Sequence, residues 1–189
     1  MADDKSIIAI GDEKPTASNY LPRIRTLYRK HLGLTRALSC AFEEAAGVCL
    51  EGSAVPPTRF DLRTAETLLQ PLLRWRSPTT RERRAWANAT DCVEAASCGV
   101  ALSAVEAALG LVAIERASTC SGADYYVASA PGDYLEHAVR LEVSGTASAD
   151  PSRIHERMRK KLQQVAHPAD PSLACVVSFG ARVIVIAAP

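Results

Sequence analysis

Neither positive nor negative charge is in clear excess in this sequence, and this balance limits the kinds of partner that the whole chain could attract. The 22 lysines and arginines nearly cancel the 21 aspartates and glutamates, which leaves a formal net charge of +1 over 189 residues. Such a balance generates no general field that would attract nucleic acid or an anionic membrane. Any charged partner must therefore be bound by a local patch.

The sequence also lacks the patterns of zinc sites, exported proteins and membrane spans. None of its six cysteines forms a CxxC pair, so we expect reduced core thiols and no structural zinc. The N-terminus carries acids where a secretory signal needs positive charge, and the apolar tract around residues 98–114 is interrupted by Ser103, Glu106 and Gly110. We therefore expect a cytoplasmic protein without a membrane span.

Glycine-rich phosphate loops and nucleophile elbows are missing as well. The stretches GVALS and VVSFG lack the glycines that flank a nucleophilic serine. These absences leave acidic side chains as the main candidates for chemistry.

With 48% apolar residues, a chain of this length can bury one core, and its patterns predict a single α/β (α+β) domain. Residues 1–19 show no sustained period, so we expect a flexible arm there. Residues 20–51 have helical spacing, as one long helix or as two with a break near Gly33. A strand ending near Trp75 is favoured next, so residues 20–90 are predicted to form a helical and extended extension.

Residues 91–189 are predicted to hold the core, in the order α-β-β-α-β-β. Helical spacing runs through DCVEAASCGVALSAVEAALGLVAIERA, which predicts one helix over residues 91–117. Two strands follow in GADYYVASAPGDYLEHAVRLEVSGT. The next helix begins at Asp150 and Pro151, a favourable N-cap and N1 pair, and two further strands flank Phe179.

Asp124 and Glu142 are the candidate metal ligands. Asp124 begins the strand-like run ADYYVA, and Glu142 lies inside VRLEVSG. If the two strands are neighbours, both carboxylates can project from one face, where they repel each other unless a cation lies between them. Carboxylate oxygens suit Mg²⁺ or Mn²⁺, which would activate water. Alternatively, Asp124 belongs to a turn and Glu142 to the solvent-exposed face of an edge strand.

These motifs resemble those of the PD-(D/E)XK nuclease superfamily, whose core runs α-β-β-β-α-β with a helix acid, a strand aspartate and a following strand that carries Glu-x-Lys. Asp124 in GADYYV matches the aspartate, and Glu142 in LEVSGT matches the glutamate. Ser144 stands where the family has its lysine. The resemblance covers roughly residues 91–189, and it implies a Mg²⁺-dependent enzyme that hydrolyses phosphodiester bonds in nucleic acid.

Two further residues would complete the site that the resemblance implies. Lys161 lies on the apolar stripe of the helix that starts at Pro151, so it is the candidate substitute for the missing lysine. Alternatively, its methylenes cover the core while its ammonium group reaches water. Glu94, one turn before Cys98, is the candidate helix acid, and its spacing from Asp91 also fits a capping box.

An arginine-rich segment is the candidate for binding the phosphates of DNA or RNA. It contains two tryptophans and the arginines Arg74, Arg76, Arg81, Arg83 and Arg84. Cationic side chains of this kind bind nucleic-acid backbones, although the solvated start of a helix explains the same composition.

A second function stays open because Ser144 replaces the family's lysine and the net charge is close to zero. In this alternative, the chain is a catalytically inactive nuclease-fold module that binds another protein of the same operon, in a bacterial defence or toxin-neutralising system. It predicts no divalent-ion binding and an apolar or mixed interface on the N-terminal helices.

Overall fold

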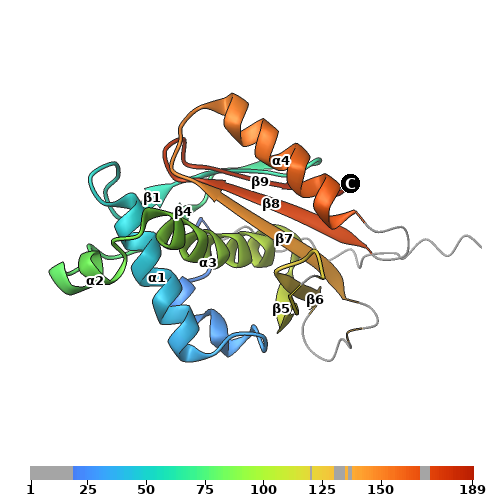
Figure 1. Cartoon of the computed structure of the whole chain (residues 1–189), viewed down its shortest axis with the longest axis horizontal. Helices are drawn as coiled ribbons and strands as arrows, with labels where there is room; N and C mark the ends of the chain where they lie inside the picture. Colours follow the sequence, from blue (N-terminus) through green and yellow to red (C-terminus); the bar gives the residue numbers. More distant parts are fainter. Residues whose placement is uncertain (1–18, 120, 130–134, 136–137, 167–170) are drawn as a thin grey trace, which may run out of the picture.

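A computed structural model of the chain has a seven-stranded mixed sheet with helices on both faces (Figure 1). The structure describes residues 19–119, 121–129, 135, 138–166 and 171–189. The expected flexible arm, apart from its last residue, lies outside this range. The predicted mixed α/β fold class is confirmed.

The first part of the chain forms short helices and short strands. A 3-10 helix, η1, spans Ile24–Arg29, and α1 spans Arg36–Leu50, so the break expected near Gly33 is present. Four short strands and one helix follow: β1 (Thr58–Arg59), β2 (Asp61–Arg63), β3 (Leu68–Leu69), β4 (Leu72–Leu73) and α2 (Thr80–Ala85). The single strand expected to end near Trp75 is therefore divided into short pieces, the last of which ends at Leu73.

The second part of the chain forms the longer elements. They are α3 (Ala89–Leu109), β5 (Leu111–Arg116), β6 (Tyr125–Ser129), β7 (Val139–Thr146), α4 (Pro151–Val165), β8 (Ser172–Ser178) and β9 (Val183–Ala187). The helix expected after Asp150 and the strands on either side of Phe179 are confirmed. Asp150 is the N-cap of α4, where its carboxylate accepts a hydrogen bond from the Ser152 amide at 2.9 Å.

The helix predicted over residues 91–117 is wrong after Leu109. α3 ends at Leu109 because Gly110 takes a left-handed conformation, φ 68°, and its amide bonds to the Glu106 carbonyl at 3.0 Å. The following LVAIER forms the strand β5, so the observed order is α-β-β-β-α-β-β. A short apolar run has no period that separates a strand from a helix, so the sequence pattern could not locate this boundary.

The sheet joins both parts of the chain. Its strand order is β3-β2-β9-β8-β7-β6-β5, with β2 parallel to β9 and β7 parallel to β8, while the other neighbours are antiparallel. The crossover from β7 to β8 is made by α4. The segment 20–90 supplies β2 and β3 to the sheet and η1 and α1 to the core, so it packs together with the rest of the single domain.

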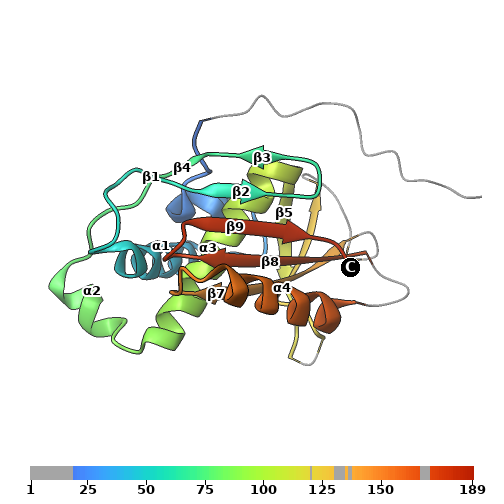
Figure 2. The same ribbon diagram turned by 90° about the horizontal axis from the view of Figure 1, so that it is seen from above.

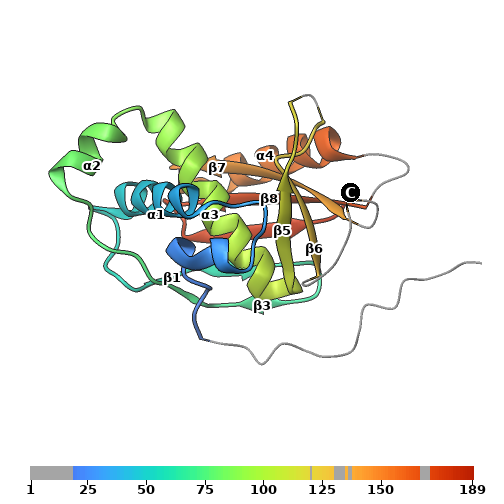
Figure 3. The same ribbon diagram turned by 90° about the horizontal axis from the view of Figure 1, so that it is seen from below.

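The helices divide between the two faces of the sheet. In Figure 1, α4 lies above the strands, while α3 and α1 lie below them, and Figures 2 and 3 show the same arrangement from above and from below. The lower face holds the main hydrophobic core, and a smaller cluster lies under α4.

α3 is the central helix of the main core. In the described part of the chain it alone is long and apolar enough to cross a membrane by length and composition, with a mean hydropathy of 1.5. Because 56% of that stretch is buried and α3 packs against α1 and the sheet, its apolar character is explained by its place in the core.

The described cysteines are free thiols, in agreement with the expected reduced core thiols. Cys92 and Cys175 are buried, and the sulfur atoms of Cys49 in α1 and Cys92 in α3 are 3.6 Å apart. Cys120 lies outside the described residues.

Candidate functional site

Asp124 and Glu142 lie beside each other where β6 begins against β7. The two strands pair with Tyr125 opposite Leu141, so one further residue along this register brings Asp124 to Glu142. The Asp124 amide donates to the Leu141 carbonyl at 2.8 Å, and the Asp124 carboxylate accepts from the Val143 amide at 2.7 Å. These bonds fix the Asp124 side chain against the strand that carries Glu142.

Glu142 is buried, with only 4% of its surface exposed. β7 lies between β6 and β8 in the sheet, so the alternative that placed Glu142 on the exposed face of an edge strand is wrong. Side chains alternate along the strand: Leu141 and Val143 belong to the main core, whereas Glu142 and Ser144 face α4.

Lys161 reaches this pair of acids from α4. Its ammonium group forms an ion pair with Glu142 and donates a hydrogen bond to the Gln164 side chain at 3.1 Å. The Lys161 side chain is 23% exposed, so the ion pair is partly shielded from water. The ammonium group therefore ends on a carboxylate, and the alternative in which it only reaches solvent does not describe the structure.

The surroundings of Glu142 act on its pKa in opposing directions. Burial raises the pKa of Glu142, and the negative charge of the neighbouring Asp124 raises it further, while the Lys161 ammonium group opposes the shift. The net result is a Glu142 pKa above its ordinary value. When ionised, the two acids carry two negative charges and Lys161 neutralises one of them, so a cation would be attracted to this position.

Arg157 lies one turn before Lys161 on α4. Its guanidinium donates to the Ser144 hydroxyl at 3.2 Å, and Ser144 is 8% exposed. Two cationic side chains of α4 thus contact two successive inward residues of β7, since Ser144 follows Glu142 by two positions.

Arg140 and Gly122 border the group on the β6 side. The Arg140 guanidinium donates to the Ser121 carbonyl, and Arg140 is 9% exposed. Gly122 has φ 72°, and a Cβ atom there would lie 3.1 Å from the guanidinium and 3.2 Å from the Gln164 carbonyl. This close approach favours glycine at position 122.

Arg140, Arg157 and Gln164 also belong to this group, and none of them was among the site residues predicted from the sequence. Two of them follow from spacings already in use, because Arg140 precedes Glu142 by two residues in a strand and Arg157 precedes Lys161 by four in a helix. Gln164 has no such signal, since its contact with Lys161 depends on the side-chain conformation near the end of α4.

Glu94 is exposed on α3, which covers the opposite face of the sheet from α4. The proposed capping box with Asp91 is wrong, because the helix begins at Ala89 and the N-cap is Asn88, whose side chain accepts from the Thr90 amide at 3.0 Å. Burial raises the pKa of Cys98 to about 12, and the charges of Asp124 and Glu94 contribute. Both acids therefore lie within electrostatic range of Cys98, but no contact between described residues joins Glu94 to Glu142 or Lys161.

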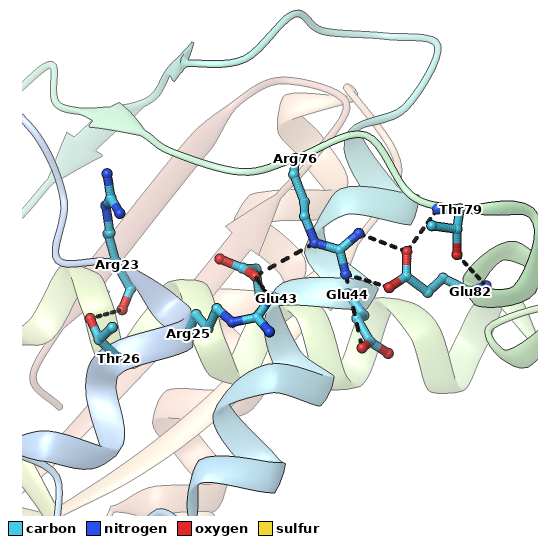
Figure 4. Close-up of polar contacts among 8 residues, drawn as sticks. All are labelled: Arg23, Arg25, Thr26, Glu43, Glu44, Arg76, Thr79 and Glu82. Atoms are coloured by element: carbon cyan, nitrogen blue, oxygen red, sulfur yellow. Dashed lines mark hydrogen bonds and ion pairs between the residues drawn. The ribbon is translucent and has the colours of Figure 1, made fainter.

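Arg76 serves as an internal anchor. Figure 4 shows its guanidinium between Glu82 at the start of α2 and Glu43 on α1, with an Arg76–Glu82 hydrogen bond of 2.9 Å and an Arg76–Glu43 separation of 4.0 Å. The hydrogen bond to Arg76 lowers the pKa of Glu82 to about 2, and the Thr79 amide contributes to the shift. These contacts hold the segment before α2 against α1.

The remaining arginines of this segment also lie away from the acids. Arg83 forms a two-pronged pair with Glu51 at 2.7 and 2.6 Å, and Arg74 stacks over the Tyr20 ring at 3.6 Å. Arg81 and Arg84 are exposed on α2. Because α2 lies at the opposite end of the molecule from the C-terminal half of α4 (Figures 1 and 3), the structure does not bring these arginines to Asp124 and Glu142.

The donor set at Asp124 and Glu142 fits a hard divalent cation. Among the described residues, no group of three or more His, Cys, Asp or Glu side chains is placed to hold a metal ion. Mg²⁺, however, is commonly bound by one or two carboxylates, with water and substrate phosphates as the other ligands. Two adjacent carboxylates meet that requirement, although Lys161 would compete with the ion for Glu142.

No family model, curated protein or solved structure matches this chain. Function must therefore be inferred from the geometry of the site.

Proposed function

We propose that this protein is a divalent-metal-dependent nuclease that hydrolyses phosphodiester bonds in nucleic acid. The observation that carries the proposal is the ion pair of Lys161 with Glu142 beside Asp124. These residues come from α4, from β7 and from the position just before β6, and they meet where Glu142 is withdrawn from solvent. Two acids and a lysine in contact, with a raised pKa on one acid, are typical of a catalytic centre.

The order of elements supports placing the chain among divergent PD-(D/E)XK-like proteins. From α3 to β8 the chain runs α-β-β-β-α-β, the order of that superfamily's core. The acids occupy the motif positions, with Ser144 in place of the lysine. Under this proposal, Lys161 supplies from α4 the ammonium group that Ser144 cannot supply.

Each residue has a separate role in the proposed site. Asp124 and Glu142 would hold Mg²⁺ or Mn²⁺, which when bound lowers the pKa of a coordinated water and offsets negative charge on the phosphate. The Val143 amide orients the Asp124 carboxylate. Lys161 favours the ionised form of Glu142 against the effect of burial. Glu94 lies outside this group of residues and has no role in the proposed site. We propose that the protein acts in the cytoplasm.

Calorimetric titration with Mn²⁺ tests the proposal directly. We expect wild type to release heat and to cleave DNA or RNA in the presence of Mg²⁺, and we expect both properties to be lost in Asp124→Asn and Glu142→Gln. Glu156→Gln is the matched control, since Glu156 is an exposed acid on α4 paired with Lys160 at 2.6 Å. Absence of heat in wild type, or full cleavage by Glu142→Gln, would contradict the proposal.

A second candidate function is protein binding without catalysis, with a partner from the same operon. Leu32, between η1 and α1, is 80% exposed, and it would lie within such a contact surface on the N-terminal helices. If this function is correct, titration of wild type with Mn²⁺ releases no heat, and the Asp124→Ala variant binds the partner as wild type does. Loss of partner binding in Leu32→Asp, with cleavage absent, would favour it over the nuclease.

A further inference from the structure

α4 carries an excess of positive charge on the side of the sheet that holds the proposed site. The helix has a single acid, Glu156, and five basic residues: Arg153, Arg157, Arg159, Lys160 and Lys161. The chain as a whole is almost neutral, but α4 is basic. Such a local patch is what the binding of a charged partner would require.

Among the cationic side chains of α4 that have a contact partner, Arg157 differs in the kind of group that it contacts. Lys160 pairs with Glu156 at 2.6 Å, and Lys161 pairs with Glu142. Arg157 instead donates to a neutral hydroxyl, that of Ser144, and within the described residues it makes no ion pair. The hydroxyl orients the guanidinium but does not neutralise its charge.

The Arg157 charge lies next to the acids on both elements that carry the proposed site. Glu142 and Ser144 are two residues apart on one face of β7, about 7 Å along the strand. Arg157 and Lys161 are one turn apart on α4, about 6 Å. Arg157 and Glu142 therefore occupy neighbouring positions across the contact between α4 and β7, so a phosphate bound by Arg157 would lie beside a cation held by Asp124 and Glu142.

We propose that Arg157 is the phosphate-binding residue of this site, contacting a phosphodiester group of the nucleic-acid backbone while Ser144 holds the guanidinium in place. This inference rests on the proposed function for the position of the cation. It assigns substrate binding to α4, where the charges adjoin the acids, and not to the arginines at the other end of the molecule.

The test compares Arg157→Gln with Arg153→Gln, an exposed arginine one turn earlier on the same helix. Binding of a short fluorescein-labelled DNA duplex, and of an RNA duplex of the same sequence, is measured by anisotropy in Ca²⁺ at several salt concentrations. We expect Arg157→Gln to weaken binding about tenfold and to reduce the salt slope by about 1. Arg153→Gln should change affinity less than about twofold.

A charge-preserving variant and a free anion sharpen the result. Arg157→Lys should keep the salt slope but lose part of the affinity, because an ammonium group cannot form the two-pronged contact of a guanidinium. Equal losses in Arg157→Gln and Arg153→Gln would overturn the inference, as would absence of duplex binding by wild type. Binding of inorganic phosphate without binding of either duplex would overturn the assignment to a nucleic-acid backbone.

Titration of Arg157→Gln with Mn²⁺ separates this inference from the proposed function. Heat equal to that of wild type, together with weakened duplex binding, supports both. If Mn²⁺ binding releases heat in both wild type and Arg157→Gln, and duplex binding is unchanged in the variant, only the role of Arg157 is overturned. Weakened duplex binding in Arg157→Gln with no heat in either protein supports Arg157 as a phosphate contact and overturns the metal-dependent nuclease.

Discussion

The two faces of the sheet are built from opposite kinds of side chain. Under α3 and α1, the buried residues form one large apolar cluster. Under α4, the apolar cluster is small, and the neighbouring buried positions of β7 are polar: Arg140, Glu142 and Ser144. The same strand serves both faces, because its alternate residues point in opposite directions.

This difference separates the part that stabilises the fold from the part that holds the proposed site. Burial of apolar surface under α3 contributes to stability in proportion to the area removed from water. Burial of Glu142 beside a second carboxylate works against stability, and the Lys161 ion pair offsets only part of that effect. A fold that tolerates such an arrangement generally retains it for function.

Gly145→Val should produce the largest effect, on the α3 face. A Cβ atom at Gly145 would overlap the Ser97 hydroxyl and lie 2.8 Å from a Val93 methyl group, because α3 packs directly on β7 there. We expect a loss of about 3 kcal/mol or more in the free energy of unfolding, measured by urea denaturation. Gly52→Ala, where no atom lies within 4 Å but φ is 80°, should cost only about 1 kcal/mol. Equal losses would refute a tight α3–β7 contact.

Truncation of one buried side chain on each face should show which of the two apolar clusters contributes more to the free energy of unfolding. Leu102→Ala on α3 removes a fully buried side chain from the large cluster, so we expect a loss of about 3 kcal/mol. Met158→Ala on α4 removes a side chain at the rim of the small cluster, and we expect about 2 kcal/mol. Chemical denaturation measures both, and a larger loss at Met158 would reverse the comparison.

Lys161→Met should destabilise the α4 face in a pH-dependent way. It leaves Glu142 buried without its counter-ion, so we expect a loss of about 2 kcal/mol at neutral pH. An acid whose pKa is raised by folding favours the folded state below its ordinary pKa and disfavours it once ionised, so the loss should shrink as pH falls and Glu142 becomes protonated. The readout is unfolding midpoint against pH.

Two variants serve as controls for that profile. Lys160→Met removes an exposed lysine from the same helix and should leave the profile unchanged. The unfolding midpoint of Glu142→Gln should equal or exceed that of wild type, because the substitution removes the buried charge. A loss from Lys161→Met that grew as pH fell would contradict the assigned electrostatics.

Arg76→Met should have the smallest effect, since the Arg76 network lies outside both clusters. The Arg76 side chain is 41% exposed, so screening by water limits the expected loss to below about 1 kcal/mol. The pKa of Glu82 is lowered to about 2, so the contribution is present above the ordinary carboxyl pKa and disappears as pH falls toward 2. Thermal unfolding at pH 7 and pH 2 would show a difference only at pH 7.

The local parts of the fold were predictable because their signals are short in range. The cap formed by Asp150 and Pro151 marked the start of α4, and helical spacing placed Lys161 on its inward side. The strand β5 was missed because the apolar run continues past Gly110, and no local pattern told helix from strand there. The arginines near α2 illustrate the converse, since their composition indicated phosphate binding while Arg76 and Arg83 form ion pairs with glutamates of α1, α2 and the residue after α1.

The sequence by itself determined the alternation of β7, which assigns Leu141 and Val143 to one face and Glu142 and Ser144 to the other. It also determined the face of α4 that turns inward. Only the tertiary structure decided that these two faces meet, which places Lys161 on Glu142 and Arg157 on Ser144. The physical reason is that periodicity fixes the direction of a side chain within its own element, whereas the partner across the gap depends on how the crossover through α4 sets that helix on the sheet.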